Sequence, residues 1–277
     1  MAIKNFIPTV WSESLLQSLD QNYVAVSNCN REFEGEIKEK GSTVRICGLD
    51  NVSVGNYVKN TDISTAQELS DNYTELVINQ AKYFNFQIDD VDRAQATPRL
   101  MELALKNAAK AIAKETDTYI YNLFSQGAHQ LVCSSSNGLD IINSLIDART
   151  KLLECGVTDP SDIVIEVTPA VAGAIMKAKI DISTDNTDVL EKGCIGNLFG
   201  SKIFVSSNIT SEMMGDGLGY HCLVRSKRAI AFAEQLSEIE AYRPELRFAD
   251  AMKGLHLYGA KVVYPLELAS LTITIPL

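Results

Sequence analysis

Residues 34–41 read Glu-Gly-Glu-Ile-Lys-Glu-Lys-Gly and open a polar ribbon that extends to residue 58. The ribbon contains one alternating segment, Thr43-Val44-Arg45-Ile46, which is typical of a half-buried strand. It has little apolar surface of its own, and an isolated two-stranded hairpin is marginal in water, with open edges that invite pairing with another chain. We therefore expect its partners to come from elsewhere, most economically from a second copy of the chain. The charged side chains available for contacts between subunits are Glu34, Glu36, Lys38, Lys40 and Arg45.

A strand and then a long helix are predicted after the ribbon. Phe84, Phe86 and Ile88 fall on one face of a strand over residues 83–88. Thr97 is a suitable N-cap, and Pro98 suits the first helical position, where its missing N–H is not needed. Apolar residues then recur at three- and four-residue steps, which predicts an amphipathic helix over residues 97–126. At 1.5 Å per residue this helix is about 40 Å long.

The rest of the chain alternates between helices and strands. Helices are predicted from Asp140 to Gly156 and from Thr168 to about Lys179, on either side of an apolar strand over 162–167. Further strands are predicted at 202–205, 222–224, 255–264 and 271–275. Residues 180–201 and the glycine-rich stretch 213–219 are expected to be loops.

Composition excludes several classes of protein. The 277 residues include 25 basic and 35 acidic side chains, and a net charge of −10 disfavours tight binding of nucleic acid. No segment approaches the roughly 18–20 apolar residues of a membrane span, and no signal peptide is recognised, so we expect a cytoplasmic protein with no membrane partner. The six cysteines form no C-x-x-C pair and are expected to be small buried hydrophobes. The densest basic cluster, residues 225–228, is expected to be a solvated strand end.

No sequence motif carries catalytic chemistry. The glycines between 193 and 200 lack the spacing of a phosphate loop, and the stretch 215–219 precedes a strand instead of following one. The acidic residues 181–188 lack the central glycine and final glutamate of a calcium loop. His129, His221 and His256 are isolated, which favours a structural or surface role for each. We therefore expect no catalytic, cofactor-binding or metal-binding residues, and an enzyme is the weaker class.

The order of these parts resembles the major capsid protein of tailed bacteriophages, which has the HK97-type fold. The likeness covers essentially the whole chain. The local runs that carry it are Ala81–Asp92, Val224–Gln235, Tyr242–Glu245, Phe248–Asp250 and Gly254–Val262.

The resemblance implies an α+β fold in four parts. These are an N-terminal arm (1–30), an extended β-loop (31–72), a peripheral domain (73–137 and 241–277) with a spine helix over 97–126, and an α/β axial domain (138–240). It also implies a structural protein that self-assembles into the icosahedral head of a tailed phage and encloses double-stranded DNA without sequence-specific binding. The implied partners are other copies in hexamers and pentamers, a separate scaffolding protein (unless the chain is already processed) and a portal. The implied location is the virion, after assembly in the cytoplasm of the host bacterium.

Two alternatives remain open at this stage. An encapsulin-type shell has the same fold but encloses an enzyme cargo. A cytoplasmic α/β enzyme or ligand-binding domain centred on residues 138–240 would use the ribbon only for dimerisation.

Overall fold

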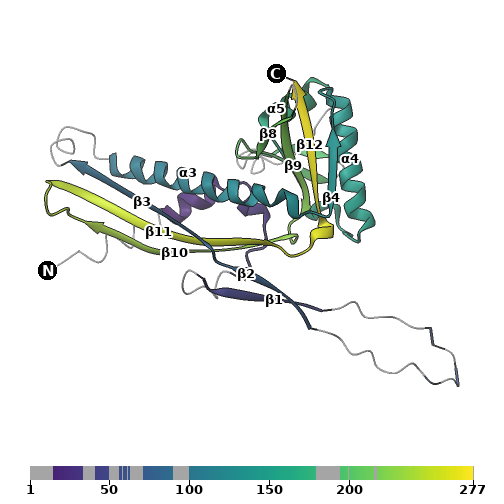
Figure 1. Ribbon diagram of the computed structural model, residues 1–277, viewed down its shortest axis with the longest axis horizontal. Helices are drawn as coiled ribbons and strands as arrows, with labels where there is room; N and C mark the ends of the chain where they lie inside the picture. The colour runs from purple at the N-terminus through teal and green to yellow at the C-terminus, as the bar shows by residue number, and fades with distance from the viewer. Residues whose placement is uncertain are drawn as a thin grey trace.

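The computed structural model describes residues 15–33, 41–49, 71–89, 100–178, 194–198, 200–214 and 217–276, together with 56, 57, 59, 60 and 62. Three strands form a long antiparallel sheet in the order β10 (Ile230–Tyr242), β11 (Ala249–Val262) and β3 (Gln80–Asp89). Helix α3 (Leu100–Tyr121) lies along this sheet (Figure 1). Its apolar stripe, including Leu105 and Ile112, is buried in one cluster with Phe232, Met252 and Tyr258.

The predicted amphipathic helix is confirmed over residues 100–121. The next five residues form a 3-10 helix, η4 (Asn122–Gln126), and residues 97–99 lie outside the described part. Tightening of the last turn into 3-10 geometry is a common way for a helix to end. The alternation seen in the sequence of β3 is also confirmed, because Phe84 and Phe86 pack against the same core as α3.

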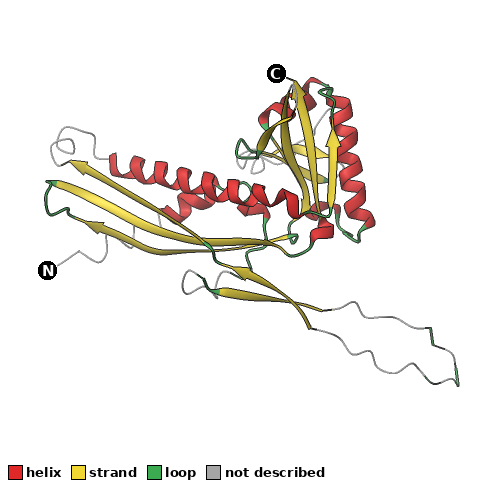
Figure 2. Cartoon of the chain, in the orientation of Figure 1, coloured by secondary structure: helices red, strands yellow, loops and turns green. Residues whose placement is uncertain are grey.

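A second unit is built on a seven-stranded mixed sheet. Its strands run in the order β4 (His129–Cys133), β12 (Leu268–Pro276), β9 (Gly217–Ser226), β5 (Ile163–Val167), β7 (Ser201–Val205) and β6 (Cys194–Leu198), and β8 (Ser211–Met214) also pairs with β9. The pairs β12–β4 and β5–β7 are parallel, and the others are antiparallel. Helices α4 (Gly138–Glu154) and α5 (Pro169–Lys177) cover the sheet (Figure 2). Apolar residues of α4, including Ile141 and Leu145, pack in one cluster with β5 and β12.

The polar ribbon begins as a hairpin with a buried root. Strand β1 (Thr43–Leu49) pairs antiparallel with β2 (Asp71–Val77), from Thr43 opposite Val77 to Leu49 opposite Asp71. Val44, Ile46 and Leu76 are buried against β10 and β11 of the long sheet, and β1 and β2 lie beside that sheet in Figure 1. We expected the packing partners of the ribbon to come from a second copy of the chain. That expectation is wrong for the root of the hairpin, which packs on the long sheet of its own chain.

The segment before the hairpin lies across both units. Residues 15–22 are helical, and Leu15 and Leu19 are buried in the same core as α3. A short 3-10 helix, η2 (Val26–Asn28), follows, and Asn30 then forms a parallel bridge with Ala231 of β10. We refer to residues 15–31 as the arm.

Two predicted loops contain strands. The stretch 180–201 includes β6, which pairs with β7 around a turn at Gly200, where φ is +89°. In the stretch 213–219, residues 213 and 214 belong to β8 and residues 217–219 to β9, and the two strands pair antiparallel. Glycine and polar residues gave these segments a loop-like composition, but pairing with a strand already in the sheet decides their structure.

Sheet membership also differs from the predicted domain boundaries. Strand β10 belongs to the long sheet, although residues 230–240 were assigned to the axial domain, and β4 and β12 belong to the seven-stranded sheet, although they were assigned to the peripheral domain. The remaining short elements are the 3-10 helices η5 (Pro160–Asp162) and η6 (Pro265–Glu267). None of the helices in the described ranges is long and apolar enough to cross a membrane.

Candidate functional site: exposed surfaces and the arm clamp

A buried polar cluster fixes the arm to both units. Arg225 of β9 and Glu166 of β5 form a bidentate ion pair, in which Nε lies 3.0 Å from Oε2 and Nη2 lies 3.1 Å from Oε1. Neither side chain is exposed. The same guanidinium donates to two carbonyl oxygens of the arm, those of Asn28 at 2.7 Å and Ala25 at 3.0 Å. Arg225 therefore holds the arm to the seven-stranded sheet.

Asp117 of α3 completes this cluster from the other unit. Its carboxylate accepts hydrogen bonds from the backbone N–H groups of Val24 (3.1 Å), Ala25 (3.0 Å) and Val26 (3.3 Å). Burial raises the pKa of Asp117 to about 6, and the three N–H donors offset only part of this effect. We call Asn28, Asp117, Glu166 and Arg225 the arm clamp.

A second cluster fastens the arm to the long sheet. Glu234 of β10 accepts hydrogen bonds from Tyr23 Oη (2.6 Å) and Arg31 Nη2 (2.8 Å), and His256 Nε2 of β11 lies 2.9 Å from its Oε2. Burial favours the neutral form of Glu234, but the contacts with His256, Tyr23 and Arg31 outweigh it and lower its pKa. The arm is thus bound through charged groups of both units, at residues 24–28 by the clamp and at residues 23 and 31 by Glu234.

These clusters correct one prediction from the sequence. The basic residues 225–228 were expected to form a solvated strand end, but Arg225 is completely buried. Two of the histidines lie in buried contacts: His256 Nε2 lies 2.9 Å from Glu234 Oε2, and His221 stacks on Phe124 with its Nδ1 3.0 Å from Thr272 Oγ1. A signal for the clamp was present in the sequence, because a glutamate inside the apolar strand 163–167 needs a buried partner.

The cysteine expectation is confirmed only in part. Cys133 and Cys222 are buried, and burial raises the pKa of Cys222 to about 12. Cys155 is exposed at the end of α4, where its sulfur lies 3.3 Å from His129 Nε2. Within the described residues, no group of three or more potential ligands could hold a metal ion.

The predicted contact residues fall mainly outside the described part of the chain, which does not include Glu34, Glu36, Lys38 and Lys40. Arg45 lies on the outer face of β1, 68% exposed. Its Nε is 3.5 Å from Glu75 Oε1 on β2, and its guanidinium lies over the ring of Tyr73. This outer face also carries Val77 and remains exposed, whereas the inner face is buried on the long sheet.

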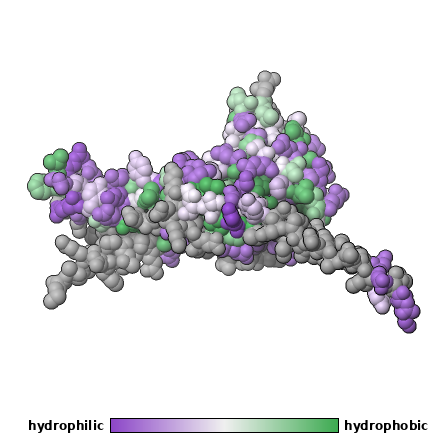
Figure 3. Space-filling model, turned by 60° about the horizontal axis from the view of Figure 1, so that its bottom comes forward, coloured by the Kyte–Doolittle hydropathy of each residue, from purple (hydrophilic) through white to green (hydrophobic). Residues whose placement is uncertain are grey.

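The far end of the long sheet exposes large apolar side chains. Leu246 and Phe248, in the turn between β10 and β11, are 97% and 83% exposed. Figure 3 shows hydrophobic and hydrophilic residues side by side at this end of the molecule. Isolated exposed apolar residues are normal, but two at one hairpin tip form a candidate contact surface.

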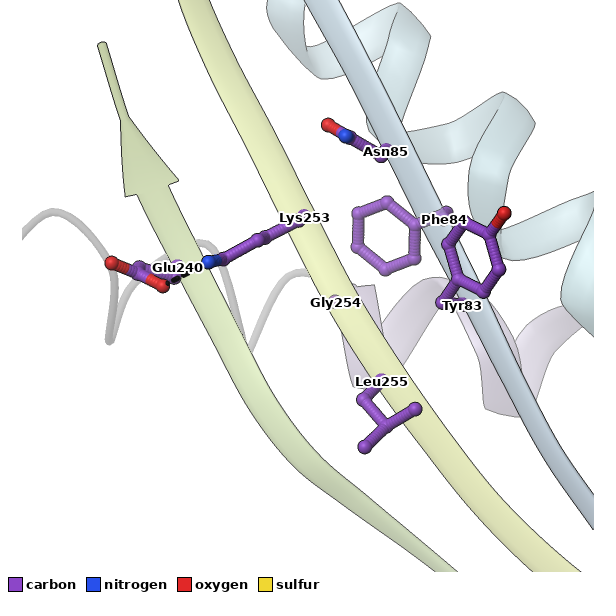
Figure 4. Close-up of a pocket in the computed structure, with 7 residues that line it drawn as sticks. All are labelled: Tyr83, Phe84, Asn85, Glu240, Lys253, Gly254 and Leu255. Atoms are coloured by element: carbon purple, nitrogen blue, oxygen red, sulfur yellow. Dashed lines mark ion pairs between the residues drawn. The ribbon is translucent and has the colours of Figure 1, made fainter. Parts of the chain in front are cut away.

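A shallow groove lies near this end on the long sheet (Figure 4). Lys253 of β11 reaches across to Glu240 of β10, with Nζ 2.7 Å from Oε2. The Phe84 ring covers the backbone of Gly254, where an added Cβ would lie 2.4 Å from Cε1 of the ring. Tyr83 is 81% exposed at the same groove. The α/β unit exposes apolar residues of its own, namely Val132, Leu139, Met176 and Met213.

Comparison with known proteins identifies the type of fold. No protein-family model and no curated protein matches the chain. A solved structure from Mycobacterium phage Che8 is 26% identical and matches over 90% of each chain with a TM-score of 0.69. The capsid of Ralstonia phage GP4 is 11% identical over 94% of this chain and 91% of that one (TM-score 0.70), and a virus-like particle from Pyrococcus furiosus is 11% identical over 96% and 99% (TM-score 0.60). The resemblance to the major capsid proteins of tailed phages is therefore confirmed, on a mixed α+β fold with several sheets.

Proposed function

We propose that this chain is the structural subunit of a tailed-phage head, and that it self-assembles into an icosahedral shell around double-stranded DNA. The observation that carries the proposal is the likeness to phage capsid structures over about nine-tenths of the chain. A net charge of −10 is compatible with a protein that encloses DNA without binding it tightly. In this role the chain is not an enzyme and needs no cofactor.

The arrangement of exposed surfaces supports a role in assembly. The hairpin projects from the body, and its outer face carries Arg45, Tyr73 and Val77. At the opposite end, Leu246 and Phe248 are exposed at the tip of the long sheet. We assign these two ends to contacts between neighbouring subunits in hexamers and pentamers. The candidate contacts at Glu34, Glu36, Lys38 and Lys40 belong to the same proposed hairpin interface.

The proposal includes partners and location. A separate scaffolding protein and a portal complete the head, assembly takes place in the cytoplasm of the host bacterium, and the mature protein is part of the virion. The proposal keeps the division into N-terminal arm (1–30), extended β-loop, peripheral domain and axial domain. It assigns β10 to the peripheral domain with the long sheet, and β4 and β12 to the axial domain with the seven-stranded sheet.

A shell that carries an enzyme cargo is the second candidate, favoured by the likeness to the Pyrococcus furiosus virus-like particle. The two candidates differ in what the particles contain. Particles isolated from the natural host would protect double-stranded DNA from nuclease under the first proposal. Under the second, they would contain a folded enzyme and no protected genome.

The test of assembly is a loop-shortened variant. Leu49 and Asp71 are paired at the end of the β1–β2 ladder, so a two-residue Asn-Gly turn can replace residues 50–70 and keep the buried root of the hairpin. We expect the unaltered chain to form capsomers, shells or tubes in negative-stain electron microscopy. The shortened variant should melt at a similar temperature but form no closed shells. An unaltered chain that stays monomeric or dimeric at high concentration would refute the proposed function.

A further inference from the structure

The arm clamp contains more acidic than basic groups. Glu166 on β5 and Asp117 on α3 supply two carboxylates, whereas the cation of the cluster is Arg225 on β9, which is paired with Glu166. The other titratable groups that face Asp117 are the Cys29 thiol of the arm and the Tyr121 hydroxyl of α3. Both are neutral at pH 7, since their ordinary pKa values lie above 7 and burial raises them further. With both acids ionised, the clamp buries one uncompensated negative charge.

The arm itself is what buries this charge. The three N–H groups that Asp117 accepts from belong to Val24, Ala25 and Val26, and the last two residues have no exposed surface. Lifting the arm would remove these donors and return the carboxylate to water. Docking of the arm therefore changes how readily Asp117 takes up a proton.

We propose that docking of the arm is linked to protonation of Asp117, so that acidification fastens the arm and a rise in pH loosens it. This inference concerns the single chain and does not depend on shell formation. The geometry allows the arm to stay docked in both protonation states. The bonds from Ala25 and Val26 both end on Oδ1, which remains an acceptor in the neutral acid, while a proton on Oδ2 weakens only the bond from Val24.

The direction follows from the pKa of Asp117, which burial raises from 3.8 to about 6 when the arm is docked. Because the pKa of Asp117 is higher in the docked state, protonation of Asp117 stabilises the docked arm. This stabilisation is fully present below the undocked pKa of 3.8 and is lost as the pH rises through about 6. Since one pKa unit corresponds to a tenfold change in an equilibrium constant, arm opening should rise about tenfold between pH 5 and pH 7.5.

Glu234 acts in the opposite direction but over a lower range. Its pKa is lowered below 4.5 in the docked state, so its contribution is present above that value and is lost as the pH falls further. The charged and titratable groups that face it are Tyr23 and Arg31 of the arm and His256 of β11. The range from pH 5 to pH 7.5 therefore isolates the effect of Asp117 from that of Glu234.

Hydrogen exchange of the amides at residues 24–26 tests the proposal on the unassembled chain. After correction for the intrinsic pH dependence of exchange, the arm-opening constant should rise about tenfold from pH 5 to pH 7.5. Asp117→Asn keeps an acceptor oxygen and should give a flat profile. Asp140→Asn, at the exposed start of α4, should keep the original profile.

Three results would overturn the proposal. They are a flat profile in the unaltered chain, an Asp117→Asn profile with the original slope, and a loss of slope in Asp140→Asn. Because the unaltered chain alone decides the first of these, the proposal stays testable even if Asp117→Asn fails to fold.

Discussion

Replacing Arg225 by methionine should be among the most destabilising single changes in this chain. The side chain is fully buried and donates to both oxygens of Glu166 and to two carbonyl oxygens of the arm. Methionine fills part of the same space but donates no hydrogen bond. The change therefore leaves Glu166 as a buried carboxylate without its cation.

The size of the effect follows from this geometry. Removing one partner of a buried ion pair costs about 3–5 kcal/mol, because the remaining charge stays in the interior. The Asn28 carbonyl loses its guanidinium donor as well, whereas the Ala25 carbonyl still accepts from the Asn28 N–H at 3.1 Å. An unsatisfied buried group costs about 1–3 kcal/mol where water cannot reach it. We expect a loss of about 3–5 kcal/mol, at the lower end if the arm detaches and lets water reach Glu166.

The assay is urea denaturation of the unassembled chain, followed by circular dichroism, for Arg225→Met and two companions. Lys82→Met removes an exposed ion pair with Glu115 and should change the free energy of unfolding by less than about 1 kcal/mol. Adding Glu166→Met to Arg225→Met removes the unpaired buried carboxylate and should recover about 1–3 kcal/mol of the free energy of unfolding. An Arg225→Met variant no less stable than Lys82→Met would refute the assigned role of the clamp.

Three further predictions concern other parts of the molecule. Gly254→Val should lower the melting temperature, with a loss of about 1–3 kcal/mol, because the added side chain overlaps a phenylalanine ring; an unchanged melting temperature would contradict this packing. The double change Leu246→Ser and Phe248→Ser should alter the free energy of unfolding by less than about 0.5 kcal/mol but reduce assembly measured by light scattering, and normal assembly would remove this tip from the proposed interface. Cys155 should react with a thiol reagent in the native chain while Cys222 stays protected, as read by peptide mass spectrometry; the reverse order would contradict their burial.

Much of the fold could be predicted from local pattern. Helix α3 was expected because its apolar residues recur at helical spacing, and α5 because Thr168 and Pro169 are a good helix start; the Thr168 hydroxyl does accept from the Val171 N–H. Strand β5 was found as a short apolar run. These elements are decided by residues close together in the sequence, which a single chain displays directly.

The remaining parts depend on contacts between distant residues. Strand β8 is exposed at every residue and owes its structure to pairing with β9, which composition does not reveal. The arm clamp comprises residues 28, 117, 166 and 225, which are far apart in the sequence and are brought to the arm only by the folded chain. The charged strand residue Glu166 signalled that a partner exists, but nothing local identified Arg225.

Electron microscopy of the purified full-length chain and the loop-shortened variant, at matched concentration, tests the central claim most directly. The account predicts capsomers, shells or tubes for the full-length chain, and no closed shells for the variant in which Asn-Gly replaces residues 50–70. A full-length chain that remains a monomer or dimer at every concentration would contradict the account.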